Sequence, residues 1–376
     1  MKQLFNRITT VVTLLYALCP MLSAQTFIEV QDSVVSDTAS ANENFVYLLN
    51  ADELRYSERV NPDAQVLVGN VVFRQDSMYM YCDSALFFQE ANSFNAYHNI
   101  RVEQGDTLFL YGDSLFYNGN TRILKIRDNV RIENTTMVLL TDSLNYERDA
   151  ELGYFFAGGT LLDEENTLTS DYGQFHTPTK MATFMKDVFL ESEDYNLSSD
   201  TLLYNTDLHT AYFVSPTEII SDETTIHTNN GNFNTDLKEA VLLNRSVIIQ
   251  KDGEQTMVGD SIVFNEAEGQ AEAFGNVEIR NYTDKLDVDG EYAYFNHQND
   301  SAVVTGNALA IDYSTGDSLY IHADTFRLLT FYNATKDTVL YREMRAFNKV
   351  KAYRTDMQMV ADSLVFNSID TCLTLY

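Results

Sequence analysis

The chain has 376 residues and a formal net charge of −30, with 25 Lys and Arg against 55 Asp and Glu. A surface this acidic repels nucleic acid and anionic membrane faces, which excludes proteins that bind either of them by charge. With 4 Pro, 16 Gly, 23 Phe and 23 Tyr, the composition also excludes a disordered chain.

The first residues have the pattern of an export signal. Lys2 and Arg7 are followed by an apolar stretch over 8–22, and small residues precede Gln25. The apolar stretch is shorter than the roughly 20 residues of a membrane-crossing helix, which favours cleavage over a membrane anchor. We therefore predict a signal peptide over 1–24 and a flexible lead-in over 25–44. Removing Lys2 and Arg7 takes the charge to −32.

From residue 45 onward a short phrase recurs. It begins with an acidic or amide residue, often followed by Ser or Thr, and continues with an aliphatic residue at +2, an aromatic residue at +4 and frequently Asn at +5. Asp113-Ser114-Leu115-Phe116-Tyr117-Asn118 is a clear copy. The copies start at residues 52, 83, 113, 142, 171, 200, 229, 260, 291, 324 and 362, and the first eight steps are all 29 to 31 residues. Such a constant step indicates a repeat protein.

A second phrase follows most copies after 17 or 18 residues, as in Asn129-Val130-Arg131-Ile132 and Asn276-Val277-Glu278-Ile279. Both phrases alternate apolar and polar residues with period 2, which indicates strands with one apolar face. Polar turns such as Gln104-Gly105-Asp106 separate them. We predict an all-β fold of about eleven two-stranded repeats of 29–31 residues over 45–376, in strands of about 10 to 12 residues. The sheet should fold over on itself and enclose an apolar groove.

The export signal, the Asp-Ser-Leu-x-Tyr-Asn and Gly-Asn-Val-x-Ile phrases and their spacing resemble the OstA-like family of lipopolysaccharide-transport proteins, of the type of LptA and the N-terminal domain of LptD. The resemblance covers roughly residues 45–376. It implies an elongated open β-jellyroll, or β-taco, whose interior holds the acyl chains of lipopolysaccharide in the periplasm. The chain is about twice as long as a minimal member, and it ends at Tyr376, before the second phrase of its last repeat is due. We expect a protein cut short at its C-terminus, or a partner that completes the last repeat.

The apolar positions of the central repeats are the candidates for lining the groove. An apolar lining favours an acyl chain by about 0.8 kcal/mol per buried CH₂ without any polar recognition. The same residues could instead pack against one another as a dry core. The candidates are Leu115, Tyr117, Val130, Ile132, Leu144, Tyr146, Leu202, Tyr204, Val247, Ile249, Ile262, Phe264, Val277 and Ile279.

The sequence also contains Gly112-Asp113-Ser114-Leu115 and Gly316-Asp317-Ser318-Leu319, a motif that names a class of lipolytic serine hydrolases. Here the motif recurs on predicted strands, whereas a nucleophilic serine occupies one strand-to-helix turn. Such enzymes also need a histidine three residues after an aspartate, and none of the six histidines has Asp at −3. We therefore predict no enzyme.

Other chemistry is weakly supported. The repeated aspartates lack the Gly-rich nine-residue period of a calcium-binding β-roll, and we expect them to begin strands and to accept hydrogen bonds from turn amides. A carbohydrate-active parallel β-helix would place carboxylates along a cleft, but no pair of carboxylates stands out. Cys82 and Cys372 are too few and too far apart for a disulfide framework or a metal site. We predict no cofactor and no metal.

The sequence thus favours an exported, periplasmic lipid conduit that serves lipopolysaccharide transport and outer-membrane assembly, either free in the periplasm or associated with the outer membrane. Its expected partners are lipopolysaccharide or a related lipid and other jellyroll proteins, or further copies of itself, joined by end-to-end strand pairing. The alternative is a structural or polysaccharide-binding β-solenoid or adhesin of the cell envelope. A conduit needs an apolar interior, whereas inward-facing polar residues would favour the polysaccharide reading.

Overall fold

A computed structural model describes residues 45–376, apart from 58–60, 105–107, 134–137, 163–165, 193–194, 223, 235, 251–252, 266–267, 297, 315, 334–338 and 368–371. The described residues form strands and turns and no helix, so none of them belongs to a helix able to cross a membrane. The predicted signal peptide (1–24) and lead-in (25–44) lie outside the described residues. The described residues divide into two compact units, which we call the N-terminal unit (45–193, plus 201–209) and the C-terminal unit (194–200, plus 210–376).

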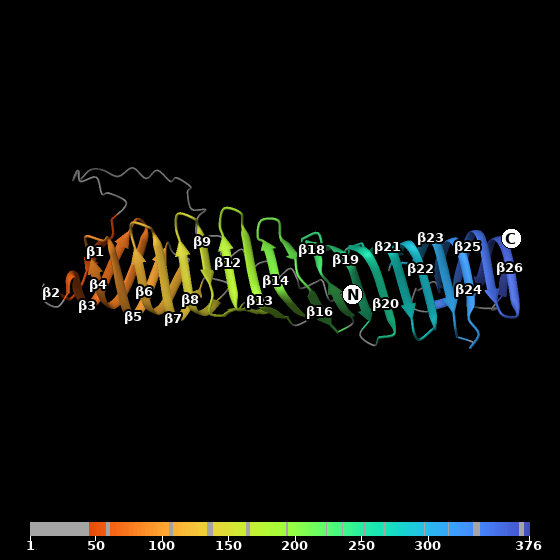
Figure 1. The fold of residues 1–376 in the computed structure, drawn as a ribbon, viewed down its shortest axis with the longest axis horizontal. Coiled ribbons are helices and arrows are strands. Elements are labelled where there is room, and N and C mark those ends of the chain that lie inside the picture. The colour runs from red at the N-terminus through yellow and green to blue at the C-terminus, as the bar shows by residue number, and fades with distance from the viewer. Residues whose placement is uncertain are drawn as a thin grey trace. The chain divides into compact units, whose positions relative to one another are not determined.

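The N-terminal unit consists of antiparallel strands, seen in Figure 1 as the orange to yellow-green arrows. The strands within residues 61–147 pair in chain order, whereas the short strands within 152–176 also pair with non-consecutive neighbours. Its strands are β1 (Tyr47–Asn50), β2 (Glu53–Ser57), β3 (Asn61–Gln75), β4 (Met78–Phe88), β5 (Ser93–Gln104), β6 (Leu108–Asn118), β7 (Ile123–Glu133), β8 (Val138–Glu147), β9 (Leu152–Phe155), β10 (Gly159–Leu162), β11 (Asn166–Ser170), β12 (Tyr172–His176) and β13 (Met181–Ser192), and β14 (Tyr195–Asn205) contributes to both units.

The C-terminal unit repeats the same construction, with each long strand paired antiparallel to the next. Its strands are β15 (Thr210–Phe213), β16 (Thr217–Ser221), β17 (Thr224–Thr228), β18 (Asn230–Asn234), β19 (Glu239–Gln250), β20 (Gln255–Asn265), β21 (Gln270–Asn281), β22 (Leu286–Asn296), β23 (Ser301–Asp312), β24 (Leu319–Tyr332), β25 (Val339–Arg354), β26 (Met357–Asn367) and β27 (Cys372–Leu375).

Each long strand bends near its middle. The pairing register shifts there, for example between Tyr97 and Ile100 of β5. Two consecutive residues have left-handed backbone at the bend of β5 (His98, φ 65°; Asn99, φ 49°), and Asp128 and Asn129 repeat this in β7. Two left-handed residues turn the strand sharply, so each long strand contributes one half to each of two half-sheets that meet at this corner. Short strands such as β9 and β10 each lie in one half-sheet. We call the half that carries the Ser-Leu-x-Tyr positions half-sheet A. The other half is called half-sheet B.

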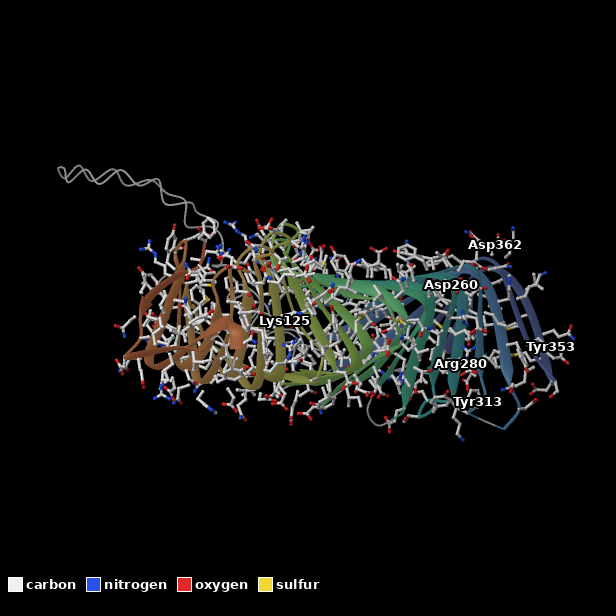
Figure 2. The ribbon with its side chains drawn as sticks, turned by 60° about the vertical axis from the view of Figure 1, so that its left-hand side comes forward. Lys125, Asp260, Arg280, Tyr313, Tyr353 and Asp362 are labelled. Carbon is white, nitrogen blue, oxygen red and sulfur yellow. The ribbon has the colours of Figure 1, made fainter. Side chains whose placement is uncertain are left out.

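The two recurring phrases meet at the corner. The Asp of the first phrase accepts a hydrogen bond from the side-chain amide of the corner Asn, which lies 16 residues later: Asn99 Nδ2 is 2.6 Å from Asp83 Oδ2, and Asn276 Nδ2 is 2.7 Å from Asp260 Oδ2. Figure 2 shows Asp260 along one edge of the C-terminal unit and Tyr313 along the opposite edge. The prediction that these aspartates begin strands was wrong for Asp83 and Asp260, which lie in the middle of β4 and β20, whereas Asp52 and Asp171 directly precede strands.

The residue before each corner Asp is small, and its position explains the Gly-Asp-Ser-Leu motif. Gly112, Gly259 and Gly290 point into the angle between the half-sheets. A Cβ atom at Gly290 would lie 2.7 Å from Cγ1 of Val304, and one at Gly112 would collide with Cγ2 of Ile126. Packing at the corner therefore explains the motif at Gly112. The copy at Gly316 lies in the turn between Asp312 and Leu319, where the glycine has φ 84° and a Cβ atom would meet nothing within 4 Å.

The Asn that ends the first phrase forms the next turn. Asn118 Oδ1 accepts hydrogen bonds from the backbone amides of Asn120 and Thr121, both at 3.0 Å. Asn205 Oδ1 accepts bonds from Asp207 and Leu208 in the same way. An Asn side chain that binds amides two and three residues ahead substitutes for a backbone turn, so the hairpin ends where the phrase ends.

The inner faces of both half-sheets carry continuous apolar rows. In half-sheet A of the N-terminal unit, hydrogen-bonded register pairs connect Leu67, Ala85, Ala96, Leu115, Ile126 and Leu144, all buried. In half-sheet B a second buried row consists of Phe73, Met80, Val102, Leu110, Ile132, Leu139, Leu161, Leu168 and Leu190. The predicted all-β jellyroll built from two-stranded repeats, with apolar residues on one face, is confirmed.

Candidate functional site

The N-terminal unit contains an apolar cavity between its two half-sheets, with a volume of about 70 Å³. Half-sheet B supplies one wall through its apolar row, and half-sheet A supplies the other. The lining residues are Met78, Val102, Gln104, Leu110, Leu124, Ile132, Leu139, Leu144, Tyr146, Gly153, Tyr154, Phe155, Leu161, Gly173, Gln174, Phe175, Thr177 and Phe184. None of these side chains is charged at neutral pH, so the cavity suits an apolar ligand.

Aromatic rings pack beside the cavity on the side of β3 to β6. Phe73 of half-sheet B and Phe94 of half-sheet A stack with ring centroids 4.0 Å apart. Phe87 lies 5.4 Å from Phe73, and Tyr117 lies 5.7 Å from Phe94. Tyr117 pairs in register with Leu124, which lines the cavity. Because these rings join opposite half-sheets, they close the interior at this side of the cavity.

Polar residues meet on the side opposite the corner, where the strands end in turns. Asp76, in the turn between β3 and β4, has its Oδ2 atom 3.0 Å from Nη2 of Arg148 and 3.3 Å from Nη2 of Arg122. The Tyr117 hydroxyl donates to Oε1 of fully buried Gln75 and accepts from Nη1 of Arg148 at 3.3 Å. These residues join the turn edges of the two half-sheets.

The protonation of this polar group follows from its surroundings. Burial raises the pKa of Tyr117, and the neighbouring Arg148 only partly offsets that effect. Burial by itself would lower the pKa of Arg148, but its hydrogen bonds and charge interactions with Tyr117 and Asp76 outweigh burial and raise it. Arg148 is therefore cationic and Tyr117 is a neutral phenol at physiological pH.

Three of the fourteen predicted groove residues line the cavity, namely Ile132, Leu144 and Tyr146. The remaining candidates of the N-terminal unit are buried on the inner faces: Leu115, Tyr117, Val130, Leu202 and Tyr204. In the C-terminal unit Ile262, Phe264 and Val277 are buried, and Ile279 is half-buried on the inner face. The prediction of Val247 and Ile249 was wrong: Ile248 between them pairs with buried Ile226 and with Met257 of the inner row, so Val247 and Ile249 lie on the other face.

Several cavity residues were not among the candidates. Leu161 lies where the second phrase of its repeat departs from the pattern, and Phe175 belongs to a first phrase with Gly173 in place of the aliphatic residue at +2. Met78, Leu110 and Leu139 lie before the Asp that starts the phrase. The signal that could have identified them is the alternation of apolar residues across the strand half that precedes each phrase, as in Val138-Leu139-Leu140-Thr141.

The inner face of the C-terminal unit is more open than that of the N-terminal unit. Its half-sheet B row consists of Met257, Ile279, Val288, Ala310, Ile321, Ala352 and Met359. Met257, Ile279, Val288 and Met359 in this row are only half-buried. The facing row of half-sheet A includes Ala273, Ala293 and Ala346. Small side chains leave space above the sheet, so apolar surface remains accessible.

The arrangement offers apolar binding surface and little reactive chemistry. Within the described residues no group of three or more His, Cys, Asp or Glu side chains is placed to hold a metal ion. Cys82 is buried at the corner, and burial raises the pKa of its thiol to about 12, which disfavours the reactive thiolate at neutral pH.

The fold and the interior together define a repetitive antiparallel β-jellyroll with an apolar interior. The sequence matches the family model described as OstA-like protein over residues 43–200 and 236–316, which is more than half of the chain. The chain therefore belongs to the OstA-like family, as the recurring phrases indicated.

A solved structure of LptH from Pseudomonas aeruginosa, described as the LptA homologous periplasmic component of the conserved lipopolysaccharide transport device, is similar to part of the chain. The similarity covers 26% of this chain and 76% of that one, with 10% sequence identity and a TM-score of 0.24, too low to show a shared fold. No curated protein sequence matches the chain.

Proposed function

We propose that this protein is a periplasmic lipid-binding conduit for lipopolysaccharide transport and outer-membrane assembly, which holds acyl chains against the apolar inner faces of its half-sheets. The observation that carries the proposal is the uncharged cavity between the half-sheets of the N-terminal unit. Membership of the OstA-like family supports it. Each buried CH₂ contributes about 0.8 kcal/mol, so several acyl chains would be held without a polar binding site.

The inner rows favour lipid over polysaccharide as the ligand. A polysaccharide site needs hydroxyl-binding side chains, whereas the rows of both units consist of Leu, Ile, Val, Ala, Phe and Met. Charged side chains occupy the outer faces and the turn edge instead: Arg101 and Glu103, for example, form an ion pair at 3.1 Å on the outer face of β5. The headgroup of a bound lipid would therefore remain in solvent at the edge where the strands end in turns.

We also propose that the edge of β26 pairs with a strand of another jellyroll protein or a second copy. Within the described residues, β27 pairs with residues 364–367 of β26 and Tyr376 bonds to the backbone of Asp362 and Ser363, while Val360 in the other half of β26 is 79% exposed. An unpaired half-strand offers backbone donors and acceptors to an incoming strand. Export by the signal peptide over 1–24 would place these contacts in the periplasm.

Native mass spectrometry of residues 25–376, purified from an envelope fraction with and without added lipopolysaccharide, tests the lipid function. Leu139 and Leu140 are adjacent in β8 and provide a matched pair, because Leu139 lines the cavity and is 7% exposed whereas Leu140 lies on the outer face and is 41% exposed. We expect bound lipid in the wild type and in Leu140→Asp, and loss of lipid in Leu139→Asp.

Circular dichroism would show whether Leu139→Asp is folded. If this variant is unfolded, the native mass spectra of the wild type still test the proposal. A wild-type protein that carries no lipid under either condition would refute the conduit and support the structural solenoid. Equal lipid loading in folded Leu139→Asp and in Leu140→Asp would place the lipid outside the interior, which also contradicts the proposal.

A further inference from the structure

The polar group at the turn edge of the N-terminal unit lies directly beside the cavity. Met78 and Tyr146 line the cavity from opposite half-sheets. Asp76 lies two residues before Met78, Arg148 lies two residues after Tyr146, and their side chains form the 3.0 Å ion pair. We call the line along which the turn edges of the two half-sheets face each other the slot. The ion pair therefore crosses the slot at the point where it would open into the cavity.

These residues form one connected set, which we call the clasp: Gln75, Asp76, Tyr117, Arg122 and Arg148. The contacts join turns 46 and 72 residues apart in the sequence, so they are not contacts between adjacent strands. The side chains of Arg148, Asp76 and Arg122 are only 14%, 25% and 27% exposed. Partial burial strengthens an ion pair relative to one on the open surface.

The clasp is also fixed to the interior. The hydroxyl of Tyr117 is held by Gln75 and Arg148, while its ring packs near Phe94 in the aromatic group beside the cavity. Gln75 Nε2 in addition donates to the carbonyl of Gly119 at 3.3 Å across the slot. A displacement of the turn edges would therefore break the ion pair, the Tyr117 hydrogen bonds and the ring packing together.

The ion pairs described in the C-terminal unit have a different geometry. Arg280 contacts Glu278 on its own strand and Asp287 and Asp289 on the neighbouring strand, and Arg245 contacts Asp260 and Glu278 near the corner. These contacts run along the outer face and the corner. The inner side chains of this unit are also more exposed than those of the N-terminal unit.

We infer that the clasp is a lateral gate: while closed, it keeps a lipid acyl chain from entering or leaving the cavity of the N-terminal unit through the slot. The inference rests on the proposed lipid function and adds a position at which exchange is controlled. A gate of this kind changes the rates of entry and exit equally, because it alters the open population and leaves the binding surface unchanged.

The test measures exchange of a fluorescent hexadecanoic acid probe by stopped flow, with phosphatidylcholine vesicles as acceptor, on residues 25–376. Asp76→Asn removes the charge that Arg148 and Arg122 share, and Tyr117→Phe keeps the ring but removes the hydroxyl. Asp149→Asn is the matched control, since Asp149 is 69% exposed and its Oδ1 atom lies 3.8 Å from Nη1 of Arg122, the nitrogen that does not pair with Asp76. For Asp76→Asn we expect association and dissociation both to become about tenfold faster, equivalent to 1.4 kcal/mol in the open population, with Kd unchanged within about twofold. Tyr117→Phe should change both rates in the same direction, and Asp149→Asn should behave as wild type.

Three outcomes would overturn the gate. If the probe binds and the exchange rates of Asp76→Asn and Tyr117→Phe equal those of the control, the clasp does not control exchange, and the proposed lipid function stands. If Kd changes while the association rate does not, Asp76 belongs to the binding surface. If the wild type does not bind the probe at all, the lipid function fails and the gate fails with it.

Discussion

Gly112, which precedes Asp113 at a corner, allows a direct test of the packing account of the Gly-Asp-Ser-Leu motif. A Cβ atom at Gly112 would collide with Cγ2 of Ile126, a side chain that is fully buried and branched at Cβ, so it cannot swing away. Gly153 is a matched control in the same unit, because a Cβ atom there meets only Cδ2 of Tyr146, at an ordinary 3.6 Å. Neither glycine has a positive φ, so alanine is compatible with the backbone at both positions.

The expected magnitudes have opposite signs. Replacing a strand Gly by Ala stabilises by about 0.4–1 kcal/mol through the unfolded chain when the new methyl group fits. Overpacking a tight core costs about 1–3 kcal/mol. We therefore expect Gly153→Ala to be neutral or stabilising and Gly112→Ala to be destabilising by about 1 kcal/mol net. The same reasoning predicts that Ser114→Ala in the motif has almost no effect.

Urea unfolding followed by hydrogen exchange of peptides from β6 and β7 measures this difference within the N-terminal unit, without assuming that the whole chain unfolds in one step. Equal stabilities of Gly112→Ala and Gly153→Ala would refute the corner-packing argument. Hydrolysis of an ester substrate by the wild type that is lost in Ser114→Ala would show that the motif has a catalytic role.

Three further predictions concern the core and the corner. Phe94→Ala should destabilise the N-terminal unit by about 3–5 kcal/mol, because it leaves a cavity and removes the stacked partner of Phe73; a smaller loss in urea unfolding would mean that the rings repack. In a double-mutant cycle, Asp260→Ala and Asn276→Ala should show a coupling of about 1 kcal/mol, and additive effects would deny the hydrogen bond a stabilising role. Since burial raises the pKa of Cys82 to about 12, its contribution to stability is complete below the unfolded thiol pKa near 9 and is lost as pH rises toward about 12. Cys82→Ala should therefore flatten the alkaline loss of stability, and an unchanged pH profile would contradict this assignment.

The repeats could be predicted from the sequence because each depends on contacts close along the chain. Asn118 forms its own turn, and Asp113 binds an Asn 16 residues later, so the spacing of the phrases records these contacts directly. The alternation of Leu115 and Tyr117 likewise follows from the pleat of one strand. Local chemistry of this kind gave the strands, the period and the inner faces.

The cavity and the clasp could not be predicted in this way. Whether an inner residue lines a cavity depends on the size of the side chain that faces it from the other half-sheet, which the alternation does not specify. The clasp joins Asp76 to Arg148 across 72 residues through turns that carry no repeated phrase. In the sequence, Asp76 cannot be told apart from an ordinary turn aspartate, since such a residue often adopts the left-handed backbone that Asp76 has, with φ 55°.

The charge of the protein and its apolar interior follow from the same alternation, and together they predict how lipid is transferred. Acidic residues occupy outward positions such as Glu133 and Glu278, so they do not oppose acyl chains inside, but the net charge of −30 repels an anionic bilayer. We therefore expect a bound fatty acyl probe to pass slowly to phosphatidylglycerol vesicles and faster as salt screens the repulsion, whereas transfer to phosphatidylcholine vesicles should depend little on salt. Fast, salt-independent transfer to both vesicle types would refute this reasoning. Slow transfer to anionic membranes would instead require another protein to receive the lipid, which is the role that strand pairing at β26 would serve.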